Sequence, residues 1–143
     1  MQRDGSSPIQ VTKGGGASAW ESIDGKTLFF TRHDGTGKQG DSPPLFAQPV
    51  GGGPERQVID AILRWDFMPT EGGIYYIIRA QPRRQYALEL RFLPFRGGKS
   101  RVVSRFNARA GQGLSASRDG KVVLYSGIGP SANADLMLIQ NFR

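Results

Sequence analysis

The sequence contains no cysteine and only one histidine, His33, among its 143 residues. Without cysteine the chain can form neither disulfides nor thiolate metal sites, and one histidine excludes a multi-histidine metal site within a single chain. We therefore expect no resident cofactor. A divalent cation held by carboxylate oxygens is the one metal that this composition leaves open.

Long hydrophobic runs are also absent. No apolar stretch approaches the roughly 20 residues that a membrane-spanning helix requires, so no membrane association is expected. The N-terminal stretch MQRDGSSPIQ is polar and lacks the apolar core of a signal peptide. As written, the chain is expected in the cytoplasm. If it is part of a longer secreted protein, it would instead be periplasmic or otherwise extracytoplasmic.

A helical period is missing as well. The 20 glycines and nine prolines leave no long run with apolar residues at helical spacing. The apolar segments are short and mostly continuous, which is typical of strands buried on both faces. Examples are TLFF at 27–30, IYYII at 74–78 and VVLY at 122–125. The sequence therefore predicts an all-β fold.

What the sequence does contain is an internal repeat. The stretch SIDGKTLFFT at 22–31 has a near-copy, SRDGKVVLYS, at 117–126, and TEGGIYYII at 70–78 is a third version with a different turn. Asp-Gly and Gly-Gly are typical of hairpin turns, because glycine reaches positive φ without steric cost. Trp20, Phe67 and Leu114 precede the three turns at intervals of 47 residues. We expect Trp20, Phe67 and the nearby Trp65 to lie in the core.

Strand-like segments flank each of these three hairpins. IQVT at 9–12, RQVI at 56–59 and SRVV at 100–103 precede them, and LFAQPV at 45–50, LELRFLPF at 88–95 and LMLIQNF at 136–142 follow them. The chain thus divides into repeats of approximately 9–55, 56–99 and 100–143 within one domain, 1–143. Four antiparallel strands in about 47 residues are typical of a β-propeller blade.

The residues of the first repeat also resemble a known family. QVTKGGGASAWESIDGKTLFFTR is similar to the TolB-type (WD-like) propeller repeat, and ADLMLIQNFR resembles the last strand of such domains. The resemblance implies a β-propeller made of four-stranded blades. It implies little about activity, because propellers carry unrelated functions.

Three blades are too few for a closed ring, which typically needs about four to eight. The N-terminal strand, at 8–12, is expected to complete the last blade of a second copy, next to LMLIQNF. Two chains would then form a six-bladed homodimeric ring with twofold symmetry. The alternative is that the chain is a piece of a longer propeller.

Charge is unevenly distributed along the chain. Residues 1–71 carry seven basic and nine acidic side chains, whereas residues 72–143 carry twelve basic and three acidic ones. Strand direction places most of the basic excess on one rim of the expected propeller, and Arg32 and Arg105 are among the arginines expected there. Lys13, Arg64, Arg79 and Arg109 are the predicted ligand-binding residues there, because arginine's planar fork suits phosphate and carboxylate groups.

Two functions are consistent with these features. The first is a non-catalytic interaction module that binds a protein, a peptide or an anionic ligand on the basic rim. The alternative is a hydrolase of small anionic esters, of the phosphoester type, in the channel of the homodimer, with His33, Asp34 and Asp66 as candidate catalytic residues. Nucleic-acid binding ranks last, because the sequence predicts neither a groove-entering helix nor a clear stacking platform.

Overall fold

The computed structural model describes residues 10–32, 42–80, 87–128 and 134–140. These residues form eleven strands in three antiparallel sheets, and they include no helix. The first sheet contains β1 (Ala19–Glu21), β2 (Thr27–Thr31), β3 (Leu45–Pro49) and β4 (Arg56–Ile59). The second contains β5 (Phe67–Pro69), β6 (Gly73–Arg79), β7 (Ala87–Pro94) and β8 (Arg101–Asn107). The third contains β9 (Arg109–Ala116), β10 (Val122–Ile128) and β11 (Ala134–Gln140). The all-β prediction is confirmed.

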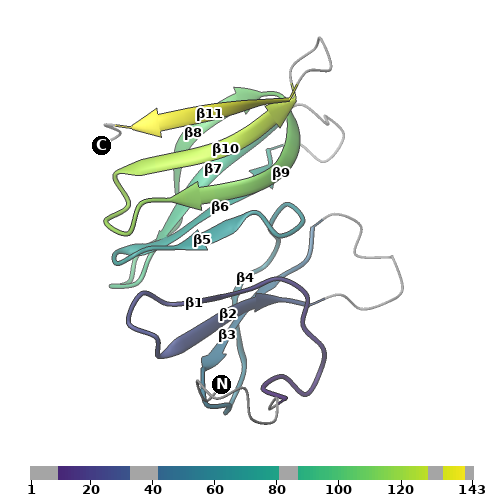
Figure 1. The fold of residues 1–143 in the computed structure, drawn as a ribbon, viewed down its shortest axis with the longest axis vertical. Coiled ribbons are helices and arrows are strands. Elements are labelled where there is room, and N and C mark those ends of the chain that lie inside the picture. Colours follow the sequence, from purple (N-terminus) through teal and green to yellow (C-terminus); the bar gives the residue numbers. More distant parts are fainter. Residues whose placement is uncertain (1–9, 33–41, 81–86, 129–133, 141–143) are drawn as a thin grey trace, which may run out of the picture.

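The strands of each sheet lie side by side in chain order, and no sheet closes on itself. The three sheets follow one another along the long axis of the molecule (Figure 1). The first and second sheets have four strands each, whereas the described part of the third has three. Residues 10–12, in the segment predicted to be an N-terminal strand, have no strand structure here.

The two Asp-Gly-Lys turns are held by the same hydrogen bonds. In the first turn the Ser22 hydroxyl donates to Oδ1 of Asp24 over 2.6 Å, and that carboxylate also accepts the N–H of Lys26. The second turn repeats both bonds 95 residues later. Gly25 has a φ of 69°, which favours glycine. The hydrogen bond from Ser22, followed by that from Lys26, lowers the pKa of Asp24.

The middle turn is shorter. In the first turn Ser22 N–H donates to the carbonyl of Thr27, five residues later. In the middle turn Thr70 N–H donates to the carbonyl of Gly73, only three residues later. Gly73 is buried, and a Cβ at this position would lie 2.2 Å from the carbonyl oxygen of Leu93. The second repeat therefore requires a glycine where the other two turns carry Thr27 and Val122.

The three sheets pack on one another through two apolar cores. The first lies between the first and second sheets and includes Phe29, Leu45 and Ile74. The second lies between the second and third sheets and includes Ile77, Leu90 and Val123. Burial of these side chains removes apolar surface from water, at about 25 cal/mol per Å². The second sheet is therefore covered on both of its faces.

The strand registers correct the predicted alignment of the repeats by one residue. In each sheet, one residue of the first strand lies opposite an aromatic residue of the second strand, and these first-strand residues are equivalent to one another. These pairs are Ala19 with Phe30, Phe67 with Tyr76, and Leu114 with Tyr125. Trp20 is therefore not equivalent to Phe67, and its side chain lies on the opposite face, because side chains alternate along a strand.

The prediction that both tryptophans lie in the core is wrong. Trp20 is 45% exposed and Trp65 is 39% exposed, whereas Phe67 is buried as expected. Trp20 lies in β1, the edge strand of the first sheet. Trp65 lies in the connection that follows β4, outside any strand.

Candidate functional site

Strand direction places several connections at the same end of the three sheets, on the right in Figure 1. They are the connections β4–β5 (60–66) and β8–β9 (108), and the C-terminal ends of β2, β6 and β10 lie at this end too. We call this the loop end. The opposite end, the turn end, carries the Asp-Gly-Lys turns. The predicted ligand-binding residues belong to the loop end.

The β4–β5 connection is anchored by two buried side chains. Ile62 belongs to the core between the first and second sheets, and Leu63 belongs to the core between the second and third. The next residue, Arg64, has a φ of 54°, in the left-handed region that non-glycine residues rarely adopt. The insertion of Ile62 and Leu63 into two different cores thus fixes the backbone from which Arg64 projects.

Asp66 ends this connection and is 2% exposed. Its Oδ1 accepts a hydrogen bond of 3.2 Å from the backbone N–H of Gly113 in β9. Burial raises the pKa of Asp66 to about 6, against the smaller opposing effects of the Gly113 hydrogen bond and the Arg64 charge. The carboxylate joins the second sheet to the third.

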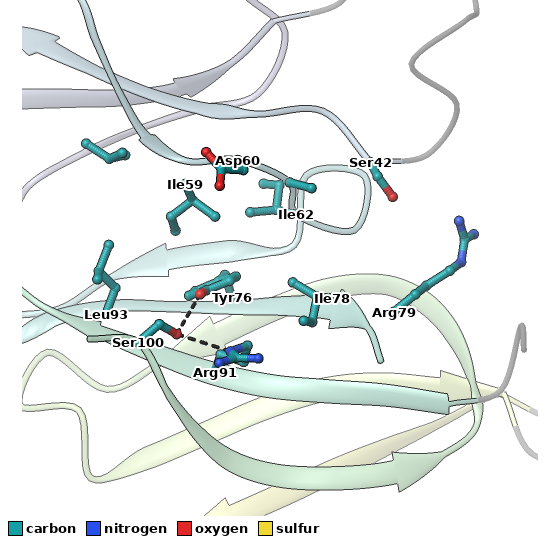
Figure 2. Close-up of a pocket in the computed structure, with 12 residues that line it drawn as sticks. Ser42, Ile59, Asp60, Ile62, Tyr76, Ile78, Arg79, Arg91, Leu93 and Ser100 are labelled. Atoms are coloured by element: carbon teal, nitrogen blue, oxygen red, sulfur yellow. Dashed lines mark hydrogen bonds between the residues drawn. The ribbon is translucent and has the colours of Figure 1, made fainter. Parts of the chain in front are cut away.

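A groove of about 630 Å³ lies between the first and second sheets (Figure 2). Its apolar lining comes from Val58, Ala61, Ile59, Ile62, Ile78 and Leu93. Its polar lining comes from Ser42, Asp60, Tyr76, Arg79, Arg91 and Ser100. In Figure 2, Arg79 and Ser42 lie at one end of the groove, and Leu93 and Ser100 lie toward the other. Arg79 is the last residue of β6, so its end of the groove is the loop end.

A hydrogen-bonded cluster holds the polar wall of the groove. The hydroxyl groups of Tyr76 and Ser100 are 2.6 Å apart, and Arg91 Nε donates to the same Ser100 oxygen over 3.1 Å. Arg91 Nη1 also donates to Glu89, whose other oxygen accepts from Arg105, each over 2.9 Å. Glu89 is buried, and two arginines surround its charge. The orientation of the Arg91 guanidinium is therefore fixed without a ligand.

The structure does not bring all the predicted site residues together. Arg79 lines the groove, Arg64 lies in the β4–β5 connection, and Lys13 lies in the segment that precedes β1. Arg109 begins β9, but its side chain lies outside the described part of the molecule. His33 and Asp34 lie outside the described residues.

Two arginines expected at the loop end have other contacts. The Arg32 guanidinium lies 4.7 Å from the centre of the Phe46 ring and forms an ion pair with Glu55, so it extends across the first sheet. Arg105 lies within β8 instead of a connection and pairs with Glu89. The basic excess at the loop end is therefore smaller than the sequence predicts.

Asp60, Glu89 and Arg91 are not among the site residues predicted from the sequence. The signal was available for two of them, because Glu89 and Arg91 interrupt the apolar segment LELRFLPF at positions that share one face of a strand. Charged residues within a strand that is otherwise apolar require partners when they are buried. Asp60 directly follows β4 and carries no comparable signal.

Within the described ranges, no three residues of the types His, Cys, Asp and Glu lie close enough together to hold a metal ion. The same ranges contain no helix long and apolar enough to cross a membrane. Neither a protein-family model nor a curated protein sequence matches the chain. The resemblance to TolB-type repeats stays a prediction.

Proposed function

We propose that the chain is a three-bladed half of a β-propeller and that a second copy completes a six-bladed ring. Three features support this proposal. Each sheet is antiparallel, its strands lie in chain order, and each sheet packs face to face with the next one. The outer strands β4 and β8 each lead directly to the first strand of the following sheet, as consecutive blades require.

We propose that this module is not catalytic and that it binds an anionic ligand at the loop end. The observation that carries the proposal is the groove between the first and second sheets, whose lining is apolar apart from a few charged and polar side chains. A mostly apolar concave site with a few oriented polar groups is typical of ligand-binding sites. Its charged lining comprises two arginines and one aspartate, Asp60.

The best-fitting ligand is a peptide segment with alternating acidic and apolar side chains. Its apolar side chains would contact Ile62 and Ile78 in the groove, and a carboxylate would contact Arg79 at the loop end. Arginine binds carboxylates well because both groups are planar and can share two parallel hydrogen bonds. Arg91 lies on the polar wall of the groove, where Ser100 and Glu89 accept its hydrogen bonds.

The test is the affinity of a fluorescein-labelled peptide of alternating glutamate and leucine, measured by anisotropy. Arg79→Ala should weaken binding about tenfold, which is typical for the loss of a charge-assisted contact. The matched control is Arg118→Ala, which removes the same charge from an exposed site at the turn end, where Arg118 pairs with Glu71. An equal loss of affinity in the two variants would show that only the net charge of the protein matters, and it would contradict the proposal.

The second candidate function is a channel-sited hydrolase of small anionic esters. The raised pKa of Asp66 favours it, because a carboxyl group with a pKa of about 6 can exchange protons near neutral pH. The burial of Asp66 argues against it, because a general base must reach water. Turnover of p-nitrophenyl phosphate that Asp66→Asn abolishes would favour the hydrolase, and no turnover by the unmodified protein would exclude this substrate class.

A further inference from the structure

The outward face of the third sheet is apolar and exposed. Leu124 in β10 and Leu136 and Leu138 in β11 lie on this face, because Leu124 pairs with Leu138 and Ser126 pairs with Leu136. All three leucines are exposed. Large exposed apolar patches on a soluble domain are typical of interaction sites.

The same face is covered in the other two sheets. The third strand of each sheet carries one leucine at an equivalent position. These leucines are Leu45 opposite Thr31, Leu90 opposite Ile77, and Leu136 opposite Ser126. The exposed fractions are 0% for Leu45, 0% for Leu90 and 80% for Leu136. The second sheet covers Leu45 and the third sheet covers Leu90. Leu136 thus occupies the position of a core residue for which the described part of the chain supplies no covering sheet.

The surface that would cover Leu136 is the outward face of the first sheet in a second copy of the chain. Phe30 of this face is equivalent to Tyr76 and Tyr125, since each pairs with the corresponding residue of the first strand. Tyr76 packs against the first sheet and Tyr125 packs against the second. By the same rule, Phe30 and its stacked neighbour Phe46 should pack against a preceding sheet.

In the single chain, the N-terminal segment occupies that position. Gln48, which is buried and shares the outward face with Phe46, donates a 2.8 Å hydrogen bond from Nε2 to the carbonyl of Val11. A Cβ on Gly16 would lie 3.8 Å from the Phe30 ring, so the backbone of this segment passes close to the ring. Residues 10–16 therefore cover part of the first sheet.

We infer that the outward faces of the first and third sheets are the two halves of one interface between copies of this chain, and that residues 10–12 exchange between them. This inference rests on the proposed ring and names its contacts. On assembly the segment leaves Gln48 and adds to the free edge of the partner's β11. An unpaired edge is the usual place for such strand addition.

The pairing in the first sheet gives the register of the added strand. In the first sheet Phe46 pairs with Gln57 of the outer strand. Met137 is the residue of β11 that is equivalent to Phe46, because Phe46 pairs with Phe30 and Met137 pairs with the equivalent Tyr125. In the aligned segments IQVT and RQVI, Gln10 corresponds to Gln57. Gln10 should therefore lie opposite Met137 of the second copy.

Because the chain has no cysteine, a disulfide can test this register directly. In the double variant Gln10→Cys, Met137→Cys, mild oxidation should give a covalent dimer of twice 15.6 kDa on a non-reducing gel. The matched control, Gln10→Cys with Arg118→Cys, places the second thiol on an exposed turn and should stay monomeric. Equal cross-linking of both pairs, or none of the first, would overturn the exchange.

The face contact is tested separately by sedimentation of the chain at up to about 100 µM, where an assembly of this kind should be dimeric. Leu136→Glu with Leu138→Glu should raise the dimer dissociation constant at least about 100-fold, because both side chains would be buried in the interface. An unchanged circular dichroism spectrum would show that the variant still folds. A wild-type monomer overturns both the inference and the ring, whereas peptide binding by that monomer would keep the proposed ligand site.

Discussion

The backbone N–H of Gly113 donates a hydrogen bond to the Asp66 carboxylate. The two residues are 47 positions apart and occupy equivalent places in consecutive sheets. Asp66 precedes Phe67, and Gly113 precedes Leu114. The carboxylate thus links the first strands of the second and third sheets. It does so in a buried position, where loss of hydration disfavours its charged form.

Asp66 should make the protein less stable as the pH rises. Its pKa is 3.8 in an ordinary environment and about 6 in the folded protein, so the folded state holds its proton more tightly than the unfolded state. The free energy of unfolding should therefore fall between these two values, by about 3 kcal/mol in total from this group. Asp66→Asn removes the titrating group and keeps an oxygen acceptor for Gly113.

The measurement is denaturant unfolding of both proteins at several pH values. Near pH 3.5 the two should be about equally stable, and near pH 7.5 Asp66→Asn should be the more stable by about 3 kcal/mol. Taking the difference between the two proteins cancels the titration of the other groups. A difference that does not change with pH would show that the carboxylate is hydrated in the folded protein.

Tyr75 provides a second link between these sheets. Its hydroxyl donates a 2.9 Å hydrogen bond to the carbonyl of Gly120 in the second Asp-Gly-Lys turn. Tyr75→Phe should lower the free energy of unfolding by about 1 kcal/mol, because the carbonyl loses its donor in a partly buried place. Tyr75→Leu should cost more, because the contact between the Tyr75 and Phe92 rings is lost as well. Equal losses in both variants would contradict this ordering.

The fold could be predicted from the sequence as far as local chemistry decides it. Continuous apolar segments and glycine turns predicted strands that the structure contains, including TLFF in β2 and VVLY in β10. The environment of Trp20 could not be predicted in this way. The equivalent residues Ala19, Phe67 and Leu114 are 48 and 47 residues apart. An alignment at a constant interval of 47 therefore selects Trp20 in place of Ala19, one residue away and on the wrong face.

The candidate site was harder to predict than the strands. Arg79 was identified because β6 ends there and points toward the loop end, which follows from strand direction alone. Arg32 also follows a strand at that end, but its guanidinium lies over the Phe46 ring and pairs with Glu55. That choice depends on tertiary contacts between residues that are far apart in sequence, which strand order does not specify.

Arg64 should tolerate glycine better than alanine. A φ of 54° places Cβ close to the backbone, and a residue in this conformation costs about 1–2 kcal/mol unless it is glycine. Both Arg64→Gly and Arg64→Ala remove the guanidinium, so the comparison isolates the backbone effect. Arg64→Gly should be more stable than Arg64→Ala by about 1 kcal/mol in denaturant unfolding. The reverse order would mean that this connection changes its conformation once the arginine is removed.

The two glycines of the middle turn should differ in their tolerance of a side chain. A Cβ on Gly73 would lie 2.2 Å from the carbonyl oxygen of Leu93 and 2.6 Å from the Phe92 ring, whereas a Cβ on Gly72 would lie 3.7 Å from that ring. Gly73→Ala should therefore force β6 away from β7 and lower the free energy of unfolding by about 3 kcal/mol or more.

Gly72→Ala is the matched control, because it adds the same methyl group one residue earlier at a distance of ordinary contact. Its stability should stay within about 1 kcal/mol of the unmodified protein. Thermal unfolding followed by circular dichroism near 215 nm would report the strand content of both variants. If the two substitutions prove equally mild, β6 and β7 are not as closely paired at Gly73 as the register with Pro94 indicates, and the shorter turn of the second repeat needs another explanation.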